Sequence, residues 1–104
     1  MSEYMYIIVR TIGYSDNIGK DGYLRDDSLK EIYSVCDNKD DAREHINRIK
    51  DMTINLIKEN NEDYEVKDIK DGSLFIIDVK NKEDNSNNIR FEIGMKGYKL
   101  NALE

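Results

Sequence analysis

The chain has 104 residues, of which 38% are hydrophobic and 37% charged, and 22 acidic against 16 basic residues give a net charge of −6. This length predicts a single domain, residues 1–104, with a core large enough for one sheet and one covering helix. The acidic balance argues against direct binding of nucleic acid and against adsorption to anionic membranes, because both depend on Lys and Arg. It would suit a mimic of DNA, but the acids alternate with Lys and Arg along every segment.

The sequence also favours a cytoplasmic protein. No apolar run approaches the roughly 18 residues that a membrane span needs. The first residues, MSEYMYIIVR, lack the basic leader and small-residue cleavage site of a signal peptide. Cys36 is the only cysteine, so no disulfide within the chain is expected.

Two strands are predicted first. EYMYIIVRTIG, residues 3–13, is rich in β-branched and aromatic residues and predicts a central strand. Its two faces are expected to be Tyr4, Tyr6 and Ile8 on one side and Met5, Ile7 and Val9 on the other. The polar stretch from Tyr14 to Asp27 predicts a long loop, and LKEIYSVC predicts a second strand on which Leu29, Tyr33 and Val35 share a face.

A helix is expected next. Asn38 suits the N-cap, Asp41 follows three residues later in the first turn, and Asn60 and Asn61 suit the end of the helix. Apolar side chains at helical spacing predict the face that packs on the sheet, with Met52 at its edge: Ala42, Ile46, Ile49, Thr53, Leu56 and Ile57.

The rest of the chain predicts a β-meander. DYEVKDIK leads through Asp71-Gly72, a hairpin signal, into SLFIIDVK. The loop NKEDNSNN connects to IRFEIGM, where apolar and polar residues alternate, and GYKLNALE is expected to form a short edge strand or a tail. The fold class is therefore α+β: an antiparallel sheet in the order β-β-α-β-β-β with one amphipathic helix packed on one face.

GYSDNIGKDG, residues 13–22, approaches two ligand-binding motifs without completing either. In a phosphate loop four residues separate two glycines, and Ser or Thr follows the Lys after the second glycine. Here five residues separate Gly13 from Gly19, and Asp21 follows Lys20 in place of the hydroxyl residue. A calcium loop beginning at Asn17 would have Gly19 at its third position, without a side-chain oxygen, and Ser28 in place of the bidentate Glu. We therefore expect an acidic solvated loop that holds neither a metal nor a cofactor.

His45 and Cys36 do not complete a reactive set. His45 and Asp41 are one helical turn apart and supply at most two metal ligands, and no further ligand is near them in the sequence. The helix N-terminus after Cys36 would favour a reactive thiolate, but free cysteines are mostly buried, and we expect a small buried hydrophobe. Without a nucleophile–base arrangement, no enzymatic activity is expected.

The segment EIYSVCDNKDDAREHINRI combines a strand, a short polar turn and a helix that opens with acids. This segment, together with the abundance of Ile, Asn, Lys and Asp and the lack of proline, resembles small acidic proteins of phages and mobile elements of AT-rich bacteria. These include anti-CRISPR and other anti-defence inhibitors. The resemblance implies a single-domain inhibitor without enzymatic residues.

The leading hypothesis is a non-enzymatic protein that inhibits or regulates a host protein by occluding its surface, such as a nucleic-acid-binding protein with a basic surface. Acidic groups speed encounter with such a partner, and exposed tyrosines suit interfaces. The predicted contact residues are Tyr14, Asp16, Asp21, Tyr23, Asp26 and Asp27. The alternative is a homo-oligomer that binds a small molecule, for example a signalling nucleotide, at its interface; that ligand would need Arg10, Arg25 and Arg90.

Overall fold

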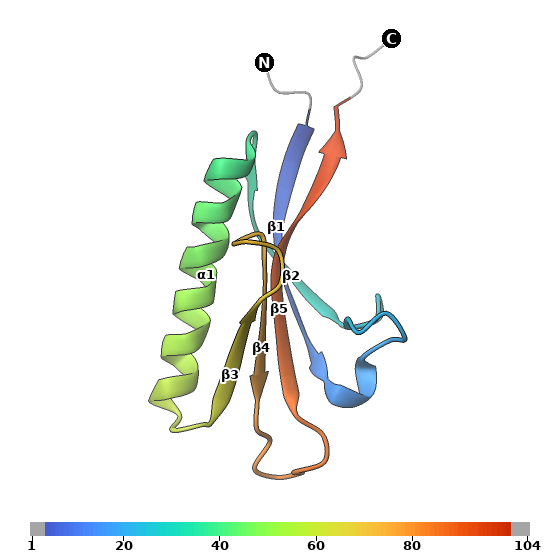
Figure 1. Cartoon of the computed structure of the whole chain (residues 1–104), viewed down its shortest axis with the longest axis vertical. Helices are drawn as coiled ribbons and strands as arrows, with labels where there is room; N and C mark the ends of the chain where they lie inside the picture. The colour runs from blue at the N-terminus through green and yellow to red at the C-terminus, as the bar shows by residue number, and fades with distance from the viewer. Residues whose placement is uncertain (1–3, 101–104) are drawn as a thin grey trace.

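The expected α+β class and element order are confirmed by a computed structural model, which describes residues 4–100. The elements are β1 (Tyr4–Tyr14), the 3-10 turn η1 (Ser15–Asn17), β2 (Leu29–Cys36), α1 (Lys39–Glu59), β3 (Tyr64–Asp68), β4 (Leu74–Val79) and β5 (Ile89–Lys99). All five strands form one antiparallel sheet in the order β2-β1-β5-β4-β3. Helix α1 lies along one face of this sheet, and no other α-helix occurs within residues 4–100 (Figure 1).

The two longest strands, β1 and β5, form the centre of the sheet. β1 pairs with β5 along its whole length, from Tyr4 opposite Lys99 to Tyr14 opposite Ile89, and with β2 on its other side. The prediction of a central first strand is thus confirmed. The expectation of a separate edge strand or tail from Gly97 is wrong for residues 97–99, which continue β5 because β1 extends far enough to satisfy their backbone groups. The last residues of that predicted tail, 101–104, lie outside the described part of the chain.

The core lies between α1 and the sheet. Its completely buried apolar side chains are Ile8, Ala42, Ile46, Ile77 and Ile93. The predicted alternation in β5 is confirmed, because Ile93 is buried and its neighbours on the same face pack against this core. Full burial of such a side chain stabilises the fold by about 1.5–3 kcal/mol.

Helix α1 begins and ends close to the predicted positions. Asn38 is the N-cap, and its side-chain oxygen accepts a hydrogen bond from the backbone N–H of Asp41 at 2.8 Å. At the other end Asn60 follows the last helical residue, and Asn61 adopts the left-handed conformation with φ of 54°. Asn tolerates this conformation better than most residues, so it ends the helix at little cost.

The predicted buried face of α1 is correct except at Leu56. Ala42, Ile46, Ile49, Thr53 and Ile57 are buried, whereas Leu56 is 50% exposed. Leu56 lies on the flank of the helix that overhangs the outer strand β2, in a depression that it shares with Tyr33 and Met52. Within residues 4–100, no strand lies beyond β2 to cover this flank.

The expectation that Leu29, Tyr33 and Val35 share a face of β2 is also wrong. The pairing with β1 shifts between Ile8 and Val9, so that Tyr33 is an extra, bulged residue. As a result Leu29 lies opposite Ile12 and Val35 lies opposite Ile7, and these two residues of β1 point to opposite faces of the sheet. The bulge therefore leaves apolar side chains on both sides of β2.

The hairpin between β3 and β4 forms as predicted. Asp71 and Gly72 at its tip have φ values of 49° and 84°, as a tight hairpin turn requires. The carboxylate of Asp68 accepts the backbone N–H of Gly72 at 2.9 Å, which closes the turn.

Truncating one side chain inside the helix face and one on its flank tests this packing. We expect Ile46→Ala to lower the free energy of unfolding by about 2–5 kcal/mol, because the cavity would lie in a fully enclosed site. Leu56→Ala should cost less than about 1 kcal/mol, because half of that side chain is already in water. Denaturant melts of both variants measure the difference, and equal losses would contradict the assigned helix face.

Candidate protein-binding surface

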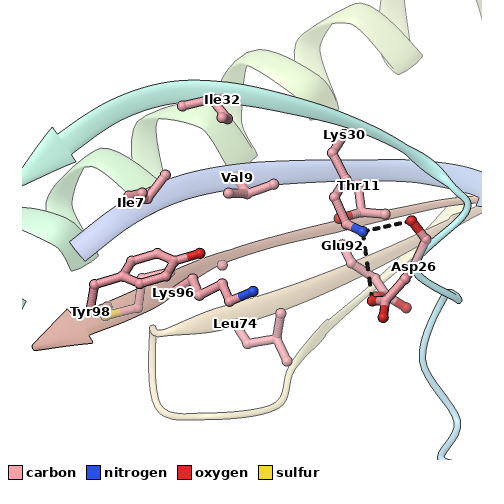
Figure 2. A pocket seen from close by; sticks show the side chains of 12 residues that line it. Ile7, Val9, Thr11, Asp26, Lys30, Ile32, Leu74, Glu92, Lys96 and Tyr98 are labelled. Atoms are coloured by element: carbon pink, nitrogen blue, oxygen red, sulfur yellow. Dashed lines mark hydrogen bonds and ion pairs between the residues drawn. The ribbon is translucent and has the colours of Figure 1, made fainter. Parts of the chain in front are cut away.

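The face of the sheet opposite α1 carries an open groove with a volume of about 420 Å³ (Figure 2). Its apolar lining includes Ile7, Val9, Ile32, Leu74 and Tyr98, which come from β1, β2, β4 and β5. Gly94 contributes to its depth, because a Cβ at this position would lie 3.0 Å from Cδ1 of Leu74. The groove thus joins strands far apart in the sequence into one apolar depression.

A loop formed by residues 18–28 lies over one end of the same face. Its apolar anchor is Leu24, which is buried and lies so close to Gly13 that a Cβ there would come within 2.9 Å of Cδ2 of Leu24. The backbone N–H of Leu24 donates to Oε2 of Glu92 at 2.8 Å, and Nη1 of Arg90 donates to the carbonyl of Gly22 at 2.9 Å. The acidic side chains of the expected solvated loop are exposed, but the loop is also attached to the sheet, because Leu24 is buried and side chains of β5 supply partners for its backbone.

Glu92 is the buried charged residue of this arrangement, with 8% of its surface exposed. Burial raises the pKa of its carboxyl group above the ordinary value and Asp21 adds to the rise, while the hydrogen bond from Leu24 and the positive charge of Arg90 oppose it. Arg90 is itself held by Asp78, with Nε 2.8 Å from Oδ1. Burial outweighs these favourable contacts, so the ionised carboxylate is held at a cost to stability.

The structure places one of the six predicted contact residues in the groove. Asp26 lines it and accepts a hydrogen bond from Nζ of Lys30 through its backbone carbonyl at 2.9 Å. Asp21 accepts the backbone N–H of Tyr23 within the loop, and Asp27 lies 3.8 Å from Arg25.

The other two predicted residues lie at a different place. Tyr14 ends β1 and is exposed, and the backbone N–H of Asp16 donates to the side chain of Asn87 at 3.0 Å. The turn that holds them is thereby attached to the loop between β4 and β5, where Ser15 also donates to the carbonyl of Asn88. The six residues therefore do not form one cluster.

The apolar groove was missed by the analysis of the sequence, although a signal for it is present. Both faces of the first strand were predicted to be apolar, and one helix can cover only one face of a sheet. An uncovered apolar face follows from these two facts. The contributions of Leu74 and Tyr98 to the groove depend on the strand order β1-β5-β4, which local sequence patterns do not reveal.

The arginines required by the nucleotide-binding alternative do not converge. Arg10 points to the helix side, where it donates to Glu31 at 2.8 Å and to Oγ1 of Thr53 at 2.9 Å. Arg90 lies on the opposite face beside Glu92, and Arg25 lies in the 18–28 loop. Within one chain they form no common anion site.

His45 and Cys36 meet at the junction of β2 and α1. Nδ1 of His45 lies 2.8 Å from Oγ of Ser34 and 3.5 Å from Sγ of Cys36. The predicted burial of Cys36 is confirmed, and this burial raises the pKa of its thiol, which disfavours the reactive thiolate. Across residues 4–100, no three His, Cys, Asp or Glu side chains are grouped so that they could hold a metal ion.

No helix within the described residues is both long enough and apolar enough to cross a membrane. Comparisons with protein-family models, curated protein sequences and solved structures found no match for this chain.

The pH dependence of stability tests the position of Glu92. A carboxyl group whose pKa is raised by folding contributes its stability fully below its ordinary value of 4.5, and this contribution is lost as the pH rises through the folded-state pKa. We therefore expect Glu92→Gln to gain stability relative to the wild type as the pH rises from about 4 to 7.

Denaturant melts across this pH range measure the gain, with Glu83→Gln in the exposed loop before β5 as the matched control. A difference in stability between wild type and Glu92→Gln that stays constant with pH would contradict the raised pKa of the Glu92 carboxyl group.

Proposed function

We propose that this protein acts without catalysis, by binding a second protein through the groove on its helix-free face and thereby occluding that protein's surface. The observation that carries the proposal is the exposed apolar groove on a sheet whose other face already holds the core. A contiguous, exposed apolar depression on a small protein is typical of a surface that binds another molecule. Ile7 and Val9 are available to a partner because α1 packs on the opposite side of β1.

The charges around the groove favour a partner with basic residues beside its apolar anchor. Asp26 lies at the groove, and Asp21 and Asp27 belong to the same loop. Within this loop Arg25 and the neighbouring Lys30 offset part of the acidity, but the whole chain retains a net charge of −6. Such a surface accelerates encounter with a positively charged partner, including a host protein whose basic channel binds nucleic acid. An anti-defence inhibitor would act in this way.

A small ligand remains the second candidate, because the groove volume of about 420 Å³ falls in the range of small-molecule sites. The lining favours a largely apolar ligand over a nucleotide. Lys30 is already held by Asp26, and the arginines face different sides of the sheet.

A charge placed in the groove separates protein binding there from binding elsewhere. We expect Val9→Lys to retain the fold, since the Lys stem covers the apolar floor while its ammonium reaches water through the open side. The same side chain would fill the groove and repel a basic partner. In affinity capture from lysate of an AT-rich bacterium, a specific partner should be recovered with wild type and lost with Val9→Lys.

Ile69→Lys is the matched control, because it also replaces a β-branched apolar side chain by Lys, but at an exposed site after β3. The captured protein is then purified and its binding is measured by surface plasmon resonance. Equal affinity for wild type and Val9→Lys would contradict a groove-centred interface, and loss with both lysine variants would indicate a nonspecific charge effect.

The kinetics of that complex test the role of the acidic loop. Replacing Asp21, Asp26 and Asp27 together by Asn should slow association more than it speeds dissociation, because charges at the rim act mainly through long-range attraction. The effect should shrink as salt rises, since the screening length is about 8 Å at physiological ionic strength.

A control with the same change in net charge is Glu44→Gln, Asp51→Asn and Glu59→Gln on exposed positions of α1. Equal association rates for the two triple variants at every salt concentration would show that the loop does not steer the partner.

A further inference from the structure

Exposed apolar side chains are concentrated at the outer edge of β2. Leu29 and Ile32 are 65% and 71% exposed. Together with four neighbours they make up six of the twelve large apolar side chains that are exposed in residues 4–100, and we call this set the β2 patch: Leu29, Ile32, Tyr33, Val35, Met52 and Leu56. Such a concentration around one eight-residue strand favours an interface.

The β2 patch extends through both layers of the fold. Ile32 and Val35 lie on the helix-free face, since they pair with Val9 and Ile7 of β1. Met52 and Leu56 lie in the helix layer, next to Tyr33 in a depression of about 390 Å³ between α1 and β2. Between these layers the backbone edge of β2 has no neighbouring strand in the described sheet, and such an edge is a template for pairing with another chain.

We propose that β2 pairs antiparallel with β2 of a second copy of this protein, around a two-fold axis that passes between Tyr33 and Ser34. The pairing would join the two sheets into one and would place the Met52 and Leu56 flanks of the two helices on the same side. A two-fold interface uses the same surface on both copies, so a surface that matches itself is required.

The residues of β2 meet this requirement. Ile32 and Val35 are symmetric about the proposed axis and lie on the same face because of the bulge, so each Ile32 meets Val35 of the other copy. Lys30 and Asp37 are symmetric about the same point, so antiparallel pairing brings opposite charges together twice. Nζ of Lys30 lies 3.7 Å from the carboxylate of Asp26 in its own chain, and in the dimer it would lie between this carboxylate and Asp37 of the second copy. The remaining charged residue of the strand, Glu31, is held within its own chain by Arg10 at 2.8 Å.

A second copy fits this edge better than an unrelated extended peptide. The bulge at Tyr33 twists β2 locally, and a second β2 carries the same bulge at the symmetric position. A lone peptide would also leave Met52 and Leu56 in water, whereas a second copy brings its own helix layer. The dimer seam includes Ile32 and Lys30, which also line the groove, but it leaves Ile7 and Val9 outside. Val35 is not part of the groove lining, so its substitution tests the dimer separately from the proposed partner binding.

Sedimentation equilibrium of the full chain from about 1 µM to 1 mM tests the dimer. We expect a concentration-dependent species of twice the 12.2 kDa chain mass. Val35→Asp should weaken this association at least about tenfold, because it places two carboxylates in the apolar seam. The matched control Ile69→Asp, an exposed site near the opposite edge of the sheet, should leave it unchanged. A wild type that is monomeric throughout, or that loses dimerisation equally with both variants, would overturn the proposal.

A charge exchange tests the antiparallel pairing itself. Lys30→Asp and Asp37→Lys should each weaken the dimer, because each places like charges opposite one another twice. The double variant restores both attractive pairs and should recover most of the association. Circular dichroism and thermal melts verify that each variant retains the fold. Singles that associate like the wild type, or a double variant that remains as weak as the singles, would overturn this arrangement of β2.

Discussion

A single helix can cover only one face of a sheet, and this sheet has apolar side chains on both faces. Helix α1 encloses the side of Ile8, Ile77 and Ile93. In the described part of the chain, the opposite side of the same strands receives only the 18–28 loop, which covers one end and leaves the rest as an open groove. The main surface features of the molecule follow from this shortage of covering elements, because each apolar group that α1 does not reach must lie under a loop, remain exposed or meet another molecule.

The 18–28 loop is attached to the sheet by a polar arrangement within a largely apolar face. Glu92 accepts the backbone N–H of Leu24, while Arg90 connects Asp78 to the loop carbonyl of Gly22. These contacts satisfy backbone groups that would otherwise be buried without partners. The carboxylate loses hydration in return, which accounts for its raised pKa. The loop is therefore part of the folded structure, and its acidic side chains are displayed from a defined position beside the groove.

A comparable arrangement on the helix side explains how a charge is accommodated beneath α1. Arg10 of the central strand lies between Glu31 and Thr53 and is close to the rings of Tyr33 and Phe91. The guanidinium of Arg10 bonds Glu31 of β2 beside the depression that Tyr33 and Leu56 line between β2 and α1. The outer strand thus combines an internally neutralised charge with apolar side chains in both layers, a combination that suits contact with another protein surface.

Local patterns in the sequence determined the elements, their order and the helix face from Ala42 to Ile57, because these depend on spacing within one segment. The nearly continuous apolar run in the first strand also indicated two apolar faces. Only the tertiary structure decided which face remained open, because α1 packs on one side and the groove joins β1, β2, β4 and β5. The bulge at Tyr33 changed which side chains of β2 share a face, Leu56 is half exposed, and Glu92 bonds Leu24, which is 68 residues away in the sequence. Each of these outcomes depends on contacts between distant segments, whose geometry no local repeat of residue types encodes.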